Sequence, residues 1–127
     1  MNTQPQINNV VNGFIEAMYF ADAYNDDEDG DSGLFNGNLP LSSQSMAAIS
    51  NYCTSVVSQL PQAVFALDAD RIGNCIYYHT MGHGTGFYDD LSLSDADNKT
   101  IDEIFDRYNC EVYSDESKAY FTFTVKA

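Results

Sequence analysis

Basic residues are scarce in this chain of 127 residues. Lysine and arginine together number 5, against 19 aspartates and glutamates, and none of them precedes Arg71. The formal net charge is therefore -14. Because affinity for phosphate groups comes from basic side chains, direct nucleic-acid binding and attachment to an anionic membrane surface are both disfavoured. The charge favours a basic partner, such as a DNA-binding protein, a cation or the basic groove of an enzyme, and the simpler interpretation is that it keeps the protein in solution.

Cysteine and long apolar runs are also limited. The three cysteines, Cys53, Cys75 and Cys110, stand far apart and include no C-x-x-C pair. An odd number of cysteines with no signal peptide predicts buried thiols in a reducing compartment. No apolar run approaches the roughly 18 residues that a membrane span requires. We therefore expect a cytoplasmic protein with one domain over residues 1–127, which is long enough for a single core.

The motifs that usually announce an enzyme are missing. There is no G-x-S-x-G nucleophile motif and no H-E-x-x-H zinc motif. Gly82, Gly84 and Gly86 alternate with other residues, but the dinucleotide fingerprint needs G-x-G-x-x-G at a junction between a strand and a helix. No lysine follows these glycines, which excludes a P-loop. The sequence thus predicts a protein that is not an enzyme and needs no cofactor.

The most unusual stretch runs from residue 74 to residue 90. Ile76 to Thr80 is rich in β-branched and aromatic residues, which favour a half-buried strand. Glycines follow at close intervals, and the pattern predicts a strand, a glycine turn and a second strand. The residues of this structural turn are Gly82, His83, Gly84 and Gly86.

The two histidines of the chain both fall in this stretch. His79 and His83, with Asp89 and Asp90 nearby, are candidate metal ligands. A metal site needs three or more ligands that converge, which a strand end and a turn do not ensure. We therefore favour the structural alternative, in which His83 forms a hydrogen bond with the backbone of the turn and His79 lies on the surface of the sheet, and expect no metal.

Helical periodicity accounts for most of the remaining chain. In the first helix, Glu16 and Asp22 are expected to face solvent. The predicted fold class is α+β, with N-terminal helices packed on an antiparallel sheet of about four strands and one inserted helix. Besides the two strands of the glycine stretch, the expected elements are helices over residues 7–24, 42–59, 61–69 and 95–108, and strands over residues 110–114 and 119–125.

An acidic loop, residues 25–40, separates the first two expected helices. It partly matches a calcium-binding loop, with acidic or amide side chains at positions 1, 3 and 5 and glycine at position 6. The position that requires a bidentate glutamate holds Asn36. A solvated acidic loop is therefore the preferred interpretation. The residues that match the calcium pattern are Asn25, Asp27, Asp29 and Gly30.

The glycine stretch resembles a signature of small proteins carried by bacteriophages. Residues 76–89, above all Gly82-His83-Gly84-Thr85-Gly86-Phe87-Tyr88-Asp89, are similar to an aromatic strand that leads into an Asn-Gly-His-Gly-Ala-Gly-Phe-Trp-Asp segment. That family carries arginines before the turn and after the Asp, where this chain has His79-Thr80 and Asp90. The resemblance implies a phage or mobile-element origin, a life in the host cytoplasm, and no assigned activity.

Charge and resemblance together predict an interaction protein. We expect it to block a basic, nucleic-acid-binding surface of a host defence protein of the restriction or CRISPR type, in the manner of a DNA mimic. Its charge equals that of roughly 24 Å of duplex. The alternatives are a small-ligand or metal-binding protein or enzyme that uses residues 79–86 with Tyr77 and Asp89, and an accessory phage protein. The expected partner-binding residues are Asp26, Asp27, Glu28, Asp29, Asp31, Asp89, Asp90, Asp102, Glu103 and Asp106.

Overall fold

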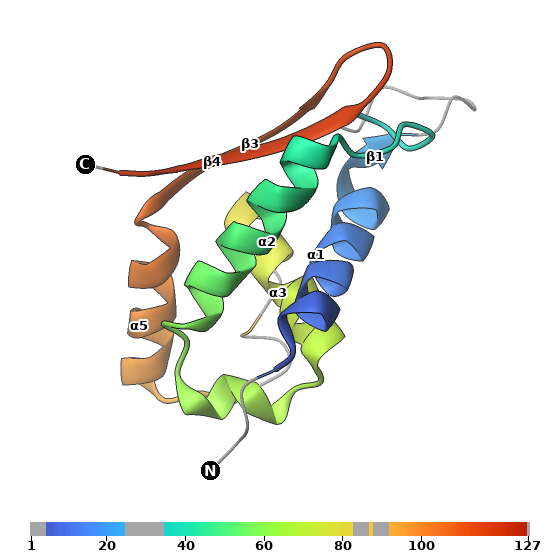
Figure 1. Cartoon of the computed structure of the whole chain (residues 1–127). Coiled ribbons are helices and arrows are strands. Elements are labelled where there is room, and N and C mark those ends of the chain that lie inside the picture. The colour runs from blue at the N-terminus through green and yellow to red at the C-terminus, as the bar shows by residue number, and fades with distance from the viewer. Residues whose placement is uncertain (1–4, 25–34, 83–86, 88–91, 127) are drawn as a thin grey trace.

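The structure is a computed structural model that describes residues 5–24, 35–82, 87 and 92–126. In the part of the chain that the structure describes, four α-helices form the body of the molecule, and a β-hairpin lies across one end of them (Figure 1). The fold class is α+β, as predicted. In chain order the elements are α1 (Ile7–Asp22), β1 (Ala23–Tyr24), β2 (Phe35–Asn36), α2 (Ser43–Val57), the 3-10 helix η1 (Gln62–Ala66), α3 (Ala69–Met81), α5 (Asp95–Phe105), β3 (Tyr108–Ser114) and β4 (Ala119–Val125).

Helices α1 and α3 cross in close contact at two glycines. A Cβ atom added to Gly13 would lie 1.9 Å from the carbonyl oxygen of Asp70, and one added to Gly73 would lie 2.0 Å from that of Val10. The side-chain amide of Asn74 also donates to the carbonyl oxygen of Gly13 over 2.7 Å. Glycine is therefore required at both positions where the two helix backbones meet.

The core is aromatic and centred on Phe14 of α1. Its ring makes edge-to-face contacts with Tyr77 of α3 at 5.1 Å and with Phe121 of β4 at 5.2 Å between ring centres. Tyr52 of α2 joins the cluster and contacts Tyr108 at 5.2 Å. Edge-to-face pairs of this kind add about 0.5–1.5 kcal/mol each beyond area burial. The cluster therefore fixes the three N-terminal helices and the hairpin to one another.

The prediction of a strand over Ile76–Thr80 is wrong, because this segment belongs to α3. Its buried residues Ile72, Cys75 and Ile76 recur at helical spacing, one face against α1. Burial of that face outweighs the local strand preference of the β-branched and aromatic side chains, a common tertiary override. The helix ends at Gly82, whose φ of 70° is left-handed, as a helix C-terminus commonly requires.

The hairpin is confirmed, whereas a four-stranded sheet is not. Strands β3 and β4 pair antiparallel, with Tyr108 opposite Val125 and Ser114 opposite Ala119. Within the described ranges the other paired strands are β1 and β2, two residues each and parallel. The predicted helix over residues 61–69 is the shorter η1. Among the helices of the described chain, none combines the length and the apolar character that crossing a membrane requires.

Candidate functional site

Helix α5 presents an exposed row of carboxylates. The hydroxyl of Ser94 accepts from the Asp97 backbone N–H over 3.1 Å and so caps the helix. Ile101 and Ile104 are buried against the body of the molecule. This packing turns the opposite side of the helix to solvent. The exposed acidic residues of α5 and its C-terminal cap are Asp95, Asp102, Glu103 and Asp106.

Three of these carboxylates stand where a helix disfavours negative charge. Asp102 and Glu103 occupy the last turn, Asp106 is the C-cap, and no basic residue lies in that turn. The helix macrodipole places partial negative charge at this end, so an anion there costs about 0.3–1 kcal/mol. The charges at this end of α5 therefore oppose the helix dipole.

The acidic surface is interrupted by basic residues. Residues 95–126 hold eight aspartates and glutamates and four of the five basic residues, so their net charge is -4. Arg107, which follows α5, donates to the side-chain oxygen of Gln59. Residues 1–94 carry the remaining -10. Most of the negative charge is therefore outside α5 and the hairpin.

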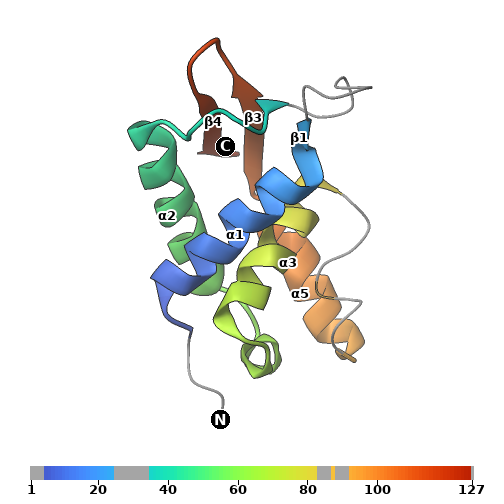
Figure 2. The same ribbon diagram turned by 90° about the vertical axis from the view of Figure 1, so that its right-hand side faces the viewer.

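All of the other predicted partner-binding residues lie outside the described ranges. β1 and β2 lie near the hairpin loop, at the end of the molecule away from α5 (Figures 1 and 2). A single acidic face joining both groups of carboxylates thus stays a prediction. The residues outside the described ranges are Asp26, Asp27, Glu28, Asp29, Asp31, Asp89 and Asp90, together with the predicted turn residues His83, Gly84 and Gly86 and the calcium-pattern residues Asn25 and Gly30.

His79 joins α3 to α5 and lies mostly inside the protein, so the prediction that it lies on the surface of a sheet is wrong. Its Nε2 is 3.3 Å from Oδ1 of Asp102, and 13% of its side chain is exposed. Its ring lies 4.5 Å from that of Phe105. Burial lowers the pKa of His79 and outweighs the opposing effect of the carboxylates of Asp102 and Asp106. The imidazole is therefore mainly neutral at pH 7, and its geometry is that of a contact between two helices.

The alternative site that would combine His79 with Tyr77 is not assembled around one cavity. Two residues apart on a helix, these side chains leave it about 200° apart. The hydroxyl of Tyr77 donates to the carboxylate of Asp22, in the core. Burial and this carboxylate raise the pKa of Tyr77. Asp22 is itself buried, so the prediction that it faces solvent is wrong, and the tyrosine hydroxyl explains how a carboxylate is accommodated there.

Neither a metal site nor a reactive thiol emerges from the described part of the chain. No group of three or more His, Cys, Asp or Glu side chains in it could hold a metal ion. Cys53 and Cys75 are buried, as predicted, whereas Cys110 is only partly buried. Burial raises the pKa of the Cys53 thiol to about 12, which keeps it protonated at pH 7.

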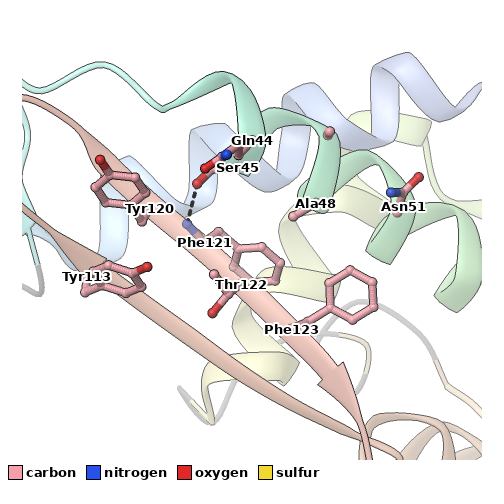
Figure 3. Close-up of a pocket in the computed structure, with 10 residues that line it drawn as sticks. Gln44, Ser45, Ala48, Asn51, Tyr113, Tyr120, Phe121, Thr122 and Phe123 are labelled. Carbon is pink, nitrogen blue, oxygen red and sulfur yellow. Dashed lines mark hydrogen bonds between the residues drawn. The ribbon is translucent and has the colours of Figure 1, made fainter.

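A groove lies between α2 and β4. Its volume is about 470 Å³, and α2 and β4 form its two walls (Figure 3). Neither element contains a charged residue, in a chain whose net charge is -14. Lining residues are Gln44, Ser45, Ala47, Ala48 and Asn51 on the helix side, and Tyr113, Tyr120, Phe121, Thr122 and Phe123 on the hairpin.

One end of the groove is ordered by a carboxylate in the hairpin turn. Asp115 accepts hydrogen bonds from the Tyr120 hydroxyl at 2.6 Å and from the backbone N–H groups of Ser117 and Lys118, both at 2.8 Å. These donors lower the pKa of Asp115 to about 2. The ring of Tyr120 stacks on that of Tyr113 at 5.1 Å. The aromatic end of the groove is thus held in one orientation.

Sequence reasoning missed this groove, although a signal was present. No charged residue occurs between Asp31 and Asp68, a gap unlike any other in this acidic chain. Such a neutral segment contains α2 and marks where the surface can be uncharged. The missing half is β4, whose position beside α2 follows only from the fold.

Comparisons with known proteins give no information about the function of this site. Searches against protein-family models, curated proteins and solved structures found no match to the chain. Any function must therefore be argued from the residues and their arrangement.

Proposed function

We propose that the chain is a binding protein, not an enzyme, and that its carboxylates occupy a basic surface of a partner protein. The observation that carries this proposal is the exposed acidic end of α5, with Asp102, Glu103 and Asp106 placed against the helix dipole. Exposed charges of one sign raise the rate of encounter with a surface of the opposite sign. No cofactor takes part in this activity.

The partner is a protein whose basic surface normally binds nucleic acid. Such a surface is built from lysines and arginines that neutralise phosphates, so carboxylates can compete for it. The resemblance of residues 76–89 to small phage proteins supports a host defence complex, of the restriction or CRISPR type, as the target in the host cytoplasm. The alternatives are an accessory phage role and ligand binding at residues 79–86.

The test is a comparison of capture from host lysate at low and high salt. The immobilised chain is expected to retain one basic protein or nucleoprotein complex at low salt and to release it as salt rises. Association of the captured protein with the variant Asp102→Asn/Glu103→Gln/Asp106→Asn should be slower, with a smaller change in its dissociation rate.

A matched variant separates the acidic end of α5 from total charge. Glu16→Gln/Glu111→Gln/Glu116→Gln removes the same number of exposed carboxylates from other elements. If both triple variants slow association equally, net charge rather than α5 is responsible. Association rates that respond to neither salt nor these substitutions reject electrostatic capture.

A further inference from the structure

The backbone of β4 has an edge that β3 does not use. The Lys126 backbone N–H donates to Arg107 across the ladder, and that of Asp115 donates to Lys118. In an antiparallel pair the hydrogen-bonded partners alternate, so Tyr120, Thr122 and Thr124 also face β3. The N–H and C=O groups of the alternate residues therefore face away from β3, on the side of the groove. These residues are Ala119, Phe121, Phe123 and Val125.

The chain itself occupies only the beginning of this edge. Ala119 donates to Pro40 over 2.9 Å and accepts from the Ser42 N–H over 3.1 Å, which is the start of a parallel strand. The Phe121 N–H then donates to the Ser45 hydroxyl over 2.9 Å, as Figure 3 shows. Within the described residues, no backbone hydrogen bond from another element reaches Phe123 or Val125. The edge is thus open from the Phe121 carbonyl onwards.

Helix α2 borders the place where a further strand would lie. In Figure 2, α2 extends past β4 on the side away from β3. The helix positions that line the groove, Gln44, Ala47, Ala48 and Asn51, follow the i, i+3, i+4, i+7 pattern of one helix face. Two of them are alanines, which allow another chain to approach closely. An extended segment would therefore find a backbone edge on one side and a small, uncharged helix face on the other.

Edges of this kind are normally protected in monomeric proteins. Charged side chains, proline or a covering loop usually blunt them. Ala119–Val125 has the sequence AYFTFTV, without charge or proline, and Val125 is 65% exposed. An unprotected edge beside an uncharged groove has the features of a strand-addition site, in which backbone hydrogen bonds give affinity and the groove selects alternate side chains.

We propose that the groove between α2 and β4 binds an extended segment of a partner protein as an added strand along Phe121–Val125. The segment carries apolar residues at alternate positions, which enter the groove, and lysine or arginine at its ends, because the whole chain has a net charge of -14. A second copy does not fit this description, since its own α2 would extend into the place that α2 of the first copy borders, and like charges would repel.

The proposal predicts at which positions of β4 a proline substitution leaves the free energy of unfolding nearly unchanged. Val125→Pro removes an N–H that faces away from β3, so the free energy of unfolding should change little. Thr124→Pro removes an N–H that faces β3 and should destabilise the hairpin. Equal destabilisation by the two substitutions, measured by urea unfolding, would show that the edge is not oriented as described and would overturn the proposal.

The binding test selects segments without assuming their sequence. A random peptide library is selected for binding to the wild-type chain and against Ala47→Trp, whose side chain fills the groove. Met46→Trp, on the same helix but outside the groove lining, is the matched control and should bind as the wild type does. We expect enrichment of peptides with alternating apolar residues and basic ends. Failure to obtain any peptide that distinguishes wild type from Ala47→Trp overturns the proposal.

Amide hydrogen exchange then locates the bound peptide. A selected peptide should slow exchange at the Phe123 and Val125 amides and leave those of Thr122 and Thr124, already in the ladder, nearly unchanged. Val125→Pro should weaken its binding roughly 3- to 10-fold, the effect of one hydrogen bond. Binding without protection of Phe123 and Val125 contradicts strand addition. Protection that appears without peptide, and grows with protein concentration, would identify a second copy as the occupant instead.

Discussion

At the scale of single residues, three positions require glycine for two different reasons. At two of them a neighbouring backbone leaves no room for a Cβ atom, and at the third φ is positive. Gly13 and Gly73 sit where α1 and α3 cross, and an added Cβ atom would meet a backbone carbonyl of the other helix at about 2 Å. Gly82 has nothing within 4 Å of its added Cβ, but its φ is 70°. The same substitution therefore tests two different physical constraints.

Gly73→Ala should destabilise the protein more than Gly82→Ala does. The first forces two helix backbones apart, which costs about 3 kcal/mol when a packed contact is overfilled. The second places alanine in the left-handed region, at a cost of about 1–2 kcal/mol. Urea unfolding measures both. If both variants lose the same free energy of unfolding, or if Gly73→Ala is more stable than the wild type, the contact between α1 and α3 is looser than described.

His79 should make the protein sensitive to mild acid. Burial lowers the pKa of His79 in the folded state. The contribution of the neutral imidazole to the free energy of unfolding is therefore fully present above the pKa of the unfolded chain, near 6.5. It is lost as pH falls below that value. The melting temperature of the wild type should therefore drop further between about pH 7.5 and about pH 5.5 than that of His79→Gln. Parallel pH profiles for the two proteins would contradict the neutral, buried imidazole.

At the scale of elements, the carboxylates at the C-terminal end of α5 oppose the helix dipole. Glu103→Gln/Asp106→Asn removes two charges that oppose the helix dipole and should stabilise the fold by about 0.3–1 kcal/mol per charge. Asp95→Asn/Asp97→Asn, in the first turn, is the matched control and should destabilise it by a similar amount. Thermal unfolding of both double variants measures these changes in stability. A gain in stability in both variants would show that general charge repulsion, rather than the helix dipole, is responsible.

Most of the helices and strands could be predicted from the sequence. Periodicity correctly predicts α1, α2, α5 and the hairpin, because each carries a regular apolar stripe or alternation. It fails at α3, where the β-branched and aromatic side chains of Ile76–Thr80 favour a strand. The contact of α3 with α1, which brings Gly73 against Val10, joins residues 63 positions apart and leaves no local signature.

The candidate site also has parts that the sequence could predict and parts that it could not. The carboxylates of α5 could be predicted as exposed from the helical pattern, since they alternate with a buried stripe. The open edge of β4 could not, because it depends on which ladder partner each residue finds and on the position of α2. The buried pair of Asp22 and Tyr77 is equally non-local, and Asp22 alone looks like a solvent-facing residue at a helix end.

At the scale of the whole molecule, the net charge of -14 opposes compaction. Like charges repel across the surface, and salt screens exposed charges within about 8 Å at physiological ionic strength. We therefore expect the melting temperature to rise as sodium chloride increases from low to physiological concentrations, while capture of a basic partner weakens. A melting temperature that stays constant over this range would indicate that the carboxylates are too dispersed to repel one another.

The crossing of α1 and α3 also bears on how the chain reaches its native state. The hydrogen bond from Asn74 to Gly13 joins residues 61 positions apart, and forming such a contact costs roughly 4 kcal/mol of loop-closure entropy. During synthesis at about 5–20 residues per second, α1 waits roughly 3–12 seconds for α3. Its apolar face is exposed for that interval, so we expect a nascent chain that ends before α3 to be recognised by chaperones.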